Sequence, residues 1–296
     1  MASWTIQKLL TWITEYFTTS GVDGPRLSAE LLLSHVLGMK RIELYTQFDK
    51  VIEKTQLDQL HDLVKRGGKG EPVAYLVGQT EFYSLSIAVN QACLIPRPET
   101  ELLVERAIEF LRKRGGEQKV CDLCTGSGCV AAAIAKNFAG AEIIATDISD
   151  EALKVAAQNI EKYQLSERVR LFYGDLFDPV IPHLDSGKFD LIVSNPPYVS
   201  ISEFEGLEKN VKDYEPRQAL LGGDDGLDIC RRIIQKAEEF LKPDGAMMLE
   251  IGYRQGDAVR ELLEGTNCFS KIKIEKDFNN NDRIAIAERE ILKEDV

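Results

Sequence analysis

The chain has 296 residues, 44% of them hydrophobic, and a formal net charge of −12 at pH 7. This length and composition are those of a globular protein with one large domain or two ordinary ones. Residues 1–96 carry 9 Lys and Arg against 10 Asp and Glu, whereas the remaining residues carry 27 against 38. The balance argues against a long nucleic-acid duplex as the main partner, because phosphates require a basic face, although it leaves room for a local basic patch.

The N-terminal stretch has no basic leader and carries Glu15 inside its apolar pattern, unlike a signal peptide. No run approaches the ~18 apolar residues of a membrane span. We therefore expect a cytoplasmic protein with no membrane partner and with reduced cysteines. Cys121 and Cys124 have the spacing of a metal or redox pair. No second pair follows, however, and the three histidines are scattered, so no metal site is predicted.

Residues 1–70 are predicted to form a small helical domain. Apolar residues recur at helical spacing from Leu9 to Phe17. A second helix is expected over 25–38, between a proline near its first turn and a glycine stop, and a third over about 55–66.

The next segment, residues 71–96, changes to a hydrophobic period of two, with short apolar stretches in PVAYLVG, EFYSLSIAVN and ACLIP. This pattern predicts short strands in a hairpin-like linker.

Residues 97–296 are predicted to form a third region, in which strand-like and helix-like segments alternate. Such alternation predicts βαβ crossovers and a mainly parallel sheet with helices on both faces. The last two strands are joined by DFNNND, which is short enough for an antiparallel hairpin. The expected strands cover about 118–123, 141–146, 168–172, 189–194, 245–251, 270–275 and 283–288. The expected helices cover about 99–114, 128–138, 149–163, 226–241 and 257–264.

The first of these strands runs directly into CTGSG and an alanine-rich helix. Gly126 and Gly128 on such a turn let the backbone approach a ligand and aim the first amides of the helix at it. A glycine turn that serves only tight packing would have the same sequence. Ala131 stands where a dinucleotide fingerprint has its third glycine, a replacement which that pattern sometimes allows.

Acidic residues follow the next two strands. Asp147 stands where an acid accepts hydrogen bonds from both ribose hydroxyls in doubly wound nucleotide-binding folds. Asp175 ends the third strand, where an adenine amino group would lie. One Asp at a strand end is usually a helix cap or a turn former. Three such features on three successive strand ends predict an adenosine-type cofactor.

The sequences DLCTGSG, GDLF and NPPY, together with Asp147 and in this order, resemble the signature set of S-adenosylmethionine-dependent methyltransferases. The resemblance implies an α/β fold with a seven-stranded Rossmann-like sheet that ends in an antiparallel hairpin, here preceded by the small helical domain. It also implies S-adenosylmethionine as the cofactor and S-adenosylhomocysteine as the product.

The sequence FDLIVSNPPYVS joins a buried strand to an asparagine, two prolines and a tyrosine. In the resembled fold, this strand end faces the methyl group. A planar amino group is a poor nucleophile, so two acceptors aimed at its hydrogens would orient it and favour the charged transition state. Asn195 can supply its side-chain oxygen, Pro196 its backbone carbonyl, and Tyr198 a flat face, while Pro196 and Pro197 have a fixed φ. Alternatively, the proline pair merely stops a strand.

Planar amino groups occur on adenine and cytosine in DNA and on glutamine in proteins, and the chemistry alone does not separate them. The sequences LIPRPETE (94–101), YEPRQALLGGDDGLDICRRII (214–234) and EIGYRQG (250–256) closely resemble the glutamine N5-methyltransferases that modify peptide chain release factors. The resemblance covers nearly the whole chain. It implies a substrate glutamine in the Gly-Gly-Gln loop of a release factor; we expect a monomer without direct nucleic-acid contacts.

Two alternatives remain open. A sister family that methylates a glutamine of a ribosomal protein shares Asn-Pro-Pro-Tyr but typically lacks the RPETE form of the linker motif. A nucleic-acid N6-adenine or N4-cytosine methyltransferase would need a basic recognition region, and residues 1–96 are close to neutral.

The functional residues of the resembled family carry over by position. The linker residues Arg97, Pro98 and Glu99 lie near the cofactor. Position 124 is more often Gly in this family, and a Cys there restricts the dihedral choices of the loop. The implied cofactor residues are Cys124, Thr125, Gly126, Ser127 and Gly128 under the methionine part, Asp147 at the ribose, Asp175 and Leu176 at the adenine edge, and Asn195. The implied catalytic and substrate-binding residues are Asn195, Pro196, Pro197 and Tyr198.

The segment 200–226 is long and has no strong period. We expect it to form part of the acceptor-binding wall, with Gly222, Gly223 and Gly226 giving it freedom, or else to be a surface excursion with a short helix. The family resemblance also implies that the helical N-terminal domain docks the protein partner.

Overall fold

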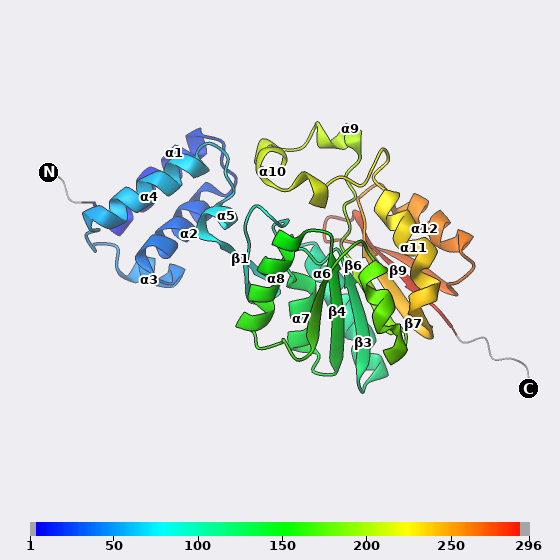
Figure 1. Cartoon of the computed structure of the whole chain (residues 1–296). Coiled ribbons are helices and arrows are strands. Elements are labelled where there is room, and N and C mark those ends of the chain that lie inside the picture. Colours follow the sequence, from blue (N-terminus) through cyan, green and yellow to red (C-terminus); the bar gives the residue numbers. More distant parts are fainter. Residues whose placement is uncertain (1–3, 291–296) are drawn as a thin grey trace, which may run out of the picture. The chain divides into compact units, whose positions relative to one another are not determined.

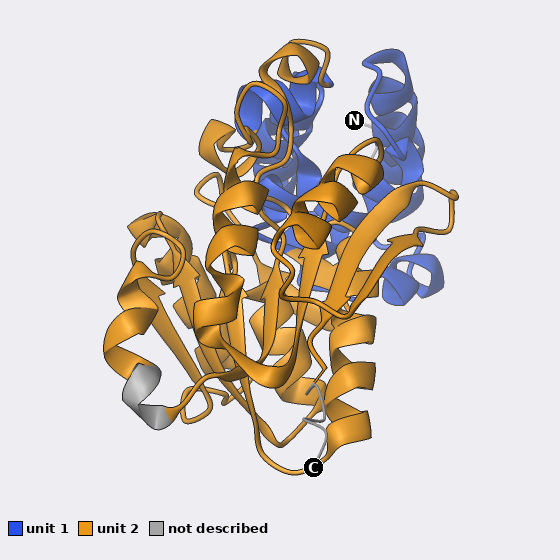
Figure 2. Ribbon diagram, turned by 90° about the vertical axis from the view of Figure 1, so that its right-hand side faces the viewer, with its two compact units in different colours: residues 1–79, 208–214 blue, residues 80–207, 215–296 orange. Residues whose placement is uncertain are grey.

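The structure is a computed structural model that describes residues 4–290, with the side chains of 184–186 left out of the description. The chain divides into two compact units (Figure 2). The first comprises Met1–Gln79 and Glu208–Tyr214, and the second comprises Thr80–Leu207 and Glu215–Val296. No helix in the described part of the chain has both the length and the apolar character needed to cross a bilayer.

The first unit is helical, as predicted. Its apolar faces enclose one core, which includes the fully buried Phe17 and Leu33. Gly38 takes a φ of 62° and ends the second helix, because glycine adopts this conformation without strain. The helices are α1 (Ile6–Thr19), α2 (Pro25–Leu37), α3 (Arg41–Thr46), α4 (Lys54–Gly67), α5 (Val73–Val77) and α10 (Lys209–Tyr214).

One linker prediction is wrong, since PVAYLVG forms the helix α5 and not a strand. The carbonyl of Pro72 accepts hydrogen bonds from the backbone N–H groups of Tyr75 (3.0 Å) and Leu76 (3.2 Å), and Leu76 is buried. Five residues are too few to distinguish a period of two from one helical turn. The predicted hairpin follows as β1 (Gln79–Phe82) and β2 (Leu85–Ala88).

The second unit contains the predicted seven-stranded sheet with its C-terminal hairpin (Figure 1). The strand order is β5-β4-β3-β6-β7-β9-β8, and β9 runs antiparallel to both of its neighbours. The strands are β3 (Gln118–Leu123), β4 (Ala141–Asp147), β5 (Val169–Tyr173), β6 (Phe189–Ser194), β7 (Leu241–Glu250), β8 (Lys271–Lys276) and β9 (Asp282–Glu288).

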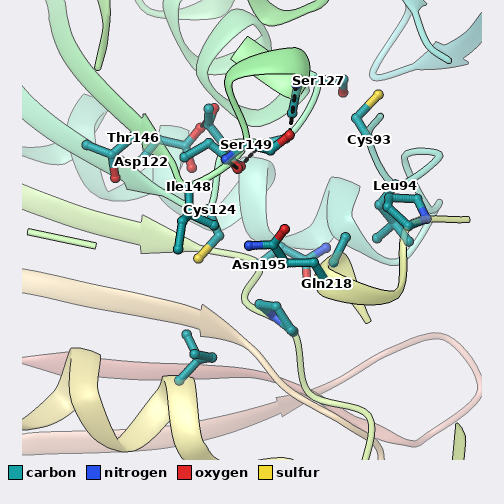
Figure 3. Close-up of a pocket in the computed structure, with 18 of the residues that line it drawn as sticks. Cys93, Leu94, Asp122, Cys124, Ser127, Thr146, Ile148, Ser149, Asn195 and Gln218 are labelled. Carbon is teal, nitrogen blue, oxygen red and sulfur yellow. Dashed lines mark hydrogen bonds between the residues drawn. The ribbon is translucent and has the colours of Figure 1, made fainter. Parts of the chain in front are cut away.

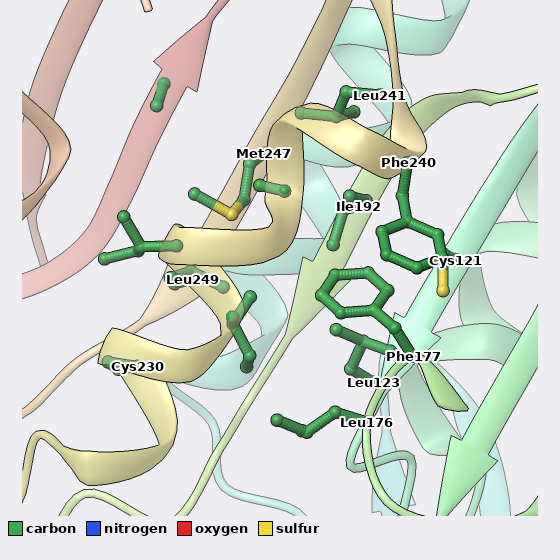
Figure 4. Packing of buried hydrophobic residues seen from close by; sticks show 14 of the residues in the cluster. Cys121, Leu123, Leu176, Phe177, Ile192, Cys230, Phe240, Leu241, Met247 and Leu249 are labelled. Atoms are coloured by element: carbon green, nitrogen blue, oxygen red, sulfur yellow. The ribbon is translucent and has the colours of Figure 1, made fainter. Parts of the chain in front are cut away.

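Helices cover both faces of this sheet. On one face, α11 and α12 enclose an apolar cluster in which the rings of Phe177 and Phe240 stack at 4.2 Å between centroids (Figure 4). On the other, α6 and α7 pack together against the strands. The helical elements of this unit are α6 (Thr100–Arg114), α7 (Cys129–Asn137), α8 (Asp150–Lys162), η1 (Asp178–Ser186), α9 (Ile201–Phe204), η2 (Arg217–Ala219), α11 (Asp228–Phe240) and α12 (Gly256–Gly265).

The strand order reverses between β3 and β6. From β3 the chain proceeds through β4 and β5 in one direction, and then returns to β6 on the other side of β3. In open parallel sheets, ligands bind at the carboxyl ends of the strands at this point. Leu123 pairs with Ser194, and the Ser194 hydroxyl donates a hydrogen bond to the Leu123 carbonyl at 2.7 Å. The glycine loop and the Asn-Pro-Pro-Tyr loop therefore leave adjacent strands at the same edge.

Candidate active site

A pocket of about 290 Å³ lies at this edge and opens between the loops that follow β3, β4, β5 and β6 (Figure 3). Its lining comes entirely from the second unit. Of the predicted site residues, it brings together Cys124, Thr125, Gly126, Ser127, Asp147, Asp175, Leu176, Asn195 and Pro197. Gly128, Pro196 and Tyr198 are not among the residues that line it.

The two glycines of the CTGSG loop have different roles. Gly126 has a φ of 56°, has open space where a Cβ would be, and donates its N–H to the Asp147 carboxylate at 2.8 Å. Gly128 has a φ of 74°, and a Cβ there would lie 3.0 Å from the Cβ of Ala156 on α8. Gly126 therefore leaves room for a close approach, whereas the absence of a side chain at Gly128 lets α8 pack closely.

Cys124 has a backbone conformation that glycine adopts without strain. Its φ is 58°, in the left-handed region that side chains rarely adopt. The thiol lies beside the pocket and packs against the apolar cluster of the α11 face (Figure 3). Burial raises the pKa of this thiol, so the group stays neutral at pH 7.

Asp147 joins the end of β4 to the glycine loop. One carboxylate oxygen accepts the Gly126 N–H, and the other accepts the Ser149 N–H at 2.9 Å. Burial raises the pKa of this carboxyl, and the backbone N–H groups partly offset that effect. A carboxylate has about four lone-pair sites, so acceptor capacity remains after these two bonds.

At the predicted adenine edge, Asp175 and Leu176 both have hydrogen-bond partners that the sequence did not indicate. Asp175 reaches the pocket, but one of its oxygens accepts a hydrogen bond from Arg232 of α11 at 2.5 Å. Leu176 has a φ of 48°, and its carbonyl accepts the Thr146 hydroxyl at 3.0 Å. Arg232 lies in the recognised segment 214–234, but sequence reasoning assigned it no role, because only the fold brings it to this edge.

In the loop after β6, Asn195 lines the pocket and donates its side-chain Nδ2–H to Thr100 Oγ1 at 3.2 Å. Pro196 is buried, and Pro197 lines the pocket. The Tyr198 hydroxyl donates to Glu250 Oε1 at 3.2 Å. Sequence reasoning assigned no role to Thr100 and Glu250, although both lie in motifs that it recognised.

The glycines of segment 220–226 hold this loop by close packing, which corrects the expectation that they give freedom. A Cβ on Gly222 would lie 2.5 Å from the Pro197 carbonyl oxygen, and one on Gly226 would lie 2.2 Å from that of Tyr198. Val199 also exchanges backbone hydrogen bonds with this segment, its N–H donating to the Leu220 carbonyl and its carbonyl accepting from Gly222, both at 2.9 Å. Glycine is needed here because two backbones touch.

The linker motif is fixed by a buried acid. Arg97 forms an ion pair with Glu215, whose other oxygen accepts the Ile95 N–H at 3.2 Å. Glu99 occupies the N-cap of α6, directly after Pro98. Sequence reasoning assigned no role to Glu215, although it lies in the recognised segment 214–234. Glu215 ties the linker to the chain just before η2, where Pro216 lines the pocket.

The lining suits an adenosine bearing a charged sulfonium. The Asp147 carboxylate supplies acceptors for hydroxyl groups, and the open face of Gly126 leaves room for a close approach. Ile148 is half exposed beside Leu176 and offers an apolar surface to a base. Ser127 is buried and also lines the pocket.

Comparison with known families places both units. Residues 8–78 match the family model described as the PrmC N-terminal domain, and residues 99–208 match the methyltransferase small domain. The chain is 43% identical to the release factor glutamine methyltransferase of Rhodopirellula baltica over 95% of both chains, and 41% identical to that of Geobacter sulfurreducens over the same shares. The chain belongs to the release factor glutamine methyltransferase family. The predicted family is thereby confirmed.

The predicted fold class of this family member also agrees with solved structures. The human methyltransferase 10 domain containing protein matches with a TM-score of 0.52 at 19% identity, over 70% of this chain and 89% of that one. At that identity the likeness concerns the fold alone.

Proposed function

We propose that the protein transfers a methyl group from S-adenosylmethionine to the side-chain amide nitrogen of the glutamine in the Gly-Gly-Gln motif of peptide chain release factors. The observation that carries this proposal is the position of Asn195. It lies in the pocket at the switch point, one strand from the glycine loop, with its Nδ2 engaged by Thr100. Its Oδ1 is therefore the end available to an incoming N–H donor.

The chain's own residues would orient the acceptor. Asn195 Oδ1 and the Pro196 carbonyl would accept the two hydrogens of the glutamine amide, and Tyr198 would provide a flat face for the amide plane. As the nitrogen loses its conjugation and becomes positive, both acceptors bind it more strongly, so they stabilise the transition state more than the ground state. The bound cofactor supplies an electrophilic methyl group on a positively charged sulfur.

The reaction needs no general base, because the methylated nitrogen is acidic enough to lose its proton to water. The new bond joins the amide nitrogen to the methyl carbon while the carbon–sulfur bond breaks, and its electron pair stays on sulfur. The nitrogen then carries an acidic proton, which passes to water. The products are N5-methylglutamine and S-adenosylhomocysteine.

On the cofactor side, Asp147 would accept hydrogen bonds from the ribose, the 124–128 loop would support the methionine part, and Asp175 and Leu176 would flank the adenine. We expect Asp147→Ala to weaken S-adenosylmethionine binding by about 10–100-fold, because one or two charged hydrogen bonds are lost. Asp175→Ala should weaken it less, since Asp175 is half exposed and already pairs with Arg232. Isothermal titration of both variants checks this order, and equal losses would contradict the ribose assignment.

The first unit would dock the release factor, in the cytoplasm, with the enzyme acting as a monomer. Deleting residues 1–70 should abolish action on the intact factor and leave cofactor binding intact. Unchanged turnover after the deletion would overturn the docking role.

Transfer of a labelled methyl group tests the proposal against its alternatives. Purified release factor should take up label, and its Gln-to-Ala variant should not. Label on a ribosomal protein in place of the release factor would favour the sister activity, and label on duplex DNA would favour a nucleic-acid methyltransferase.

A further inference from the structure

The side-chain amide of Asn195 has a donor end and an acceptor end, and only one orientation suits an N–H₂ substrate. If the amide turned over, its own N–H₂ would face that of the substrate, and two donors repel. The orientation depends on Thr100, which is 1% exposed at the start of α6 and takes a hydrogen bond from Asn195 Nδ2 at 3.2 Å.

A hydroxyl alone cannot fix that orientation. It donates as readily as it accepts, so Thr100 could equally well donate to Asn195 Oδ1 and hold the amide the wrong way round. The hydroxyl becomes a dedicated acceptor toward Asn195 only if its own proton is engaged elsewhere.

Glu250 is the buried acid that we consider as the acceptor of this proton. It ends β7, is 0% exposed, and accepts the Tyr198 hydroxyl at Oε1. Its second oxygen, Oε2, has no hydrogen-bond partner within the described part of the chain. Burial raises the pKa of this carboxyl to about 7, and the Thr100 hydroxyl is among the groups that lower it. A buried carboxyl oxygen of this kind is costly unless a donor turns toward it.

We propose that Thr100 and Glu250 are positioning residues, which lock Asn195 with Oδ1 toward the acceptor amide by directing the Thr100 hydroxyl proton to Glu250. The inference rests on the proposed transfer to a glutamine amide. Glu250 then holds both functional side chains of the acceptor loop, Tyr198 directly and Asn195 through Thr100. In this role both act through these two side chains; Thr100 also lines the pocket, whereas Glu250 does not.

Thr100→Val tests this role, because valine keeps the shape and removes the hydroxyl. We expect turnover of the release factor to fall by about tenfold or more, as for a misoriented transition-state partner, with cofactor affinity nearly unchanged. Thr100→Ser keeps the hydroxyl and should restore most of the rate. Thr266→Val, which removes a hydroxyl that bonds only within its own helix end, is the matched control and should leave turnover unchanged.

A double-mutant cycle separates positioning from general structural support. In an Asn195→Ala background, Thr100→Val should cost no further turnover, because the residue it orients is gone. If Thr100→Val costs the same factor in both backgrounds, or if Thr100→Ser is as damaging as Thr100→Val, the proposal is overturned.

A readout that needs no substrate keeps this proposal separate from the proposed function. In ¹⁵N-asparagine-labelled protein, the side-chain amide signal that disappears in Asn195→Ala should show one proton protected from exchange, in wild type and in Thr100→Ser. The protection should be lost in Thr100→Val and reduced in Glu250→Gln. Protection that persists in Thr100→Val contradicts the lock. The two proposals can therefore fail separately. If the amide proton is protected as expected but the protein methylates no release factor, the orientation of Asn195 by Thr100 is supported and the proposed function is refuted.

Discussion

One buried acid lies behind each of the two functional loops. Asp122 lies beneath the glycine loop and accepts the Thr125 hydroxyl at 2.6 Å, while Glu250 lies beneath the acceptor loop and accepts the Tyr198 hydroxyl at 3.2 Å. Both are essentially inaccessible to solvent, and burial raises the pKa of each to about 7. The two acids differ in the sequence separation between each acid and the residue that donates a hydrogen bond to it.

The cofactor side is built locally, and the acceptor side is built from distant segments. Asp122 and Thr125 are three residues apart, whereas Glu250 and Tyr198 are 52 apart, and Thr100 and Asn195 are 95 apart. The cofactor loop can therefore form with its own strand and helix. The acceptor loop takes its geometry only when α6, β7 and the 220–226 segment have assembled around it.

The largest expected effect is on the acceptor side. Asn195→Ala should lower turnover by about 10²-fold or more, because it removes a preorganised acceptor from the transition state, and should leave cofactor affinity nearly unchanged. Single-turnover kinetics and titration with S-adenosylmethionine check this split. An equal loss of cofactor affinity would make Asn195 chiefly a cofactor ligand.

Gly226→Ala should break the support of the acceptor loop. The new Cβ would meet the Tyr198 carbonyl at a position whose φ is 78°, so we expect a loss of about 2–4 kcal/mol in the free energy of unfolding, with reduced turnover. Gly265→Ala, in open space at the end of α12, is the control and should change stability by less than about 0.5 kcal/mol. Denaturant titration compares them, and equal stability of both variants would refute the close-packing role.

The two buried acids should make stability depend on pH in the same direction. Burial raises each pKa above its unfolded value, which is 3.8 for Asp122 and 4.5 for Glu250, so the folded state binds these protons more tightly. Their stabilising contribution is complete below about pH 4 and is lost as the pH rises through about 7, by about 3–4 kcal/mol for each group. Asp147 reinforces the shift at Asp122, while Arg283 opposes it at Glu250.

Asp122→Asn and Glu250→Gln should each flatten this decline when the free energy of unfolding is measured from pH 4 to pH 8. Glu264→Gln, on the exposed face of α12, is the control. A decline as steep in both variants as in wild type would show that these acids are not the cause.

The smallest effect concerns Cys124. Its replacement by glycine relieves the strain of the left-handed conformation but removes the packing of the thiol. These two contributions to the free energy of unfolding are each about 1 kcal/mol and have opposite signs, so stability should change by less than about 1 kcal/mol. Cofactor affinity should stay within about threefold, because the backbone conformation is already one that glycine adopts without strain. Thermal melting and titration check both, and a much larger loss of affinity would mean that the thiol itself contacts the cofactor.

The same contrast explains what the sequence could predict. The seven strands and the strand-to-helix turn at the glycine loop follow from local patterns, and the structure confirms them. The partners of the acceptor loop do not, because Thr100, Glu250 and Gly226 acquire their contacts only through tertiary packing. PVAYLVG was misjudged because the five residues of α5 do not define a period. Arg232 lines the pocket only because the fold brings α11 to Asp175, with which Arg232 forms an ion pair.

The position of the transferred methyl group tests the account most directly. Release factor incubated with the enzyme and S-adenosylmethionine would be digested, and the Gly-Gly-Gln peptide sequenced by mass spectrometry. The account predicts one methyl group on the side-chain amide nitrogen of that glutamine with the wild-type enzyme, and almost none with Asn195→Ala. A methyl group on any other residue, or equal modification by Asn195→Ala, would contradict it.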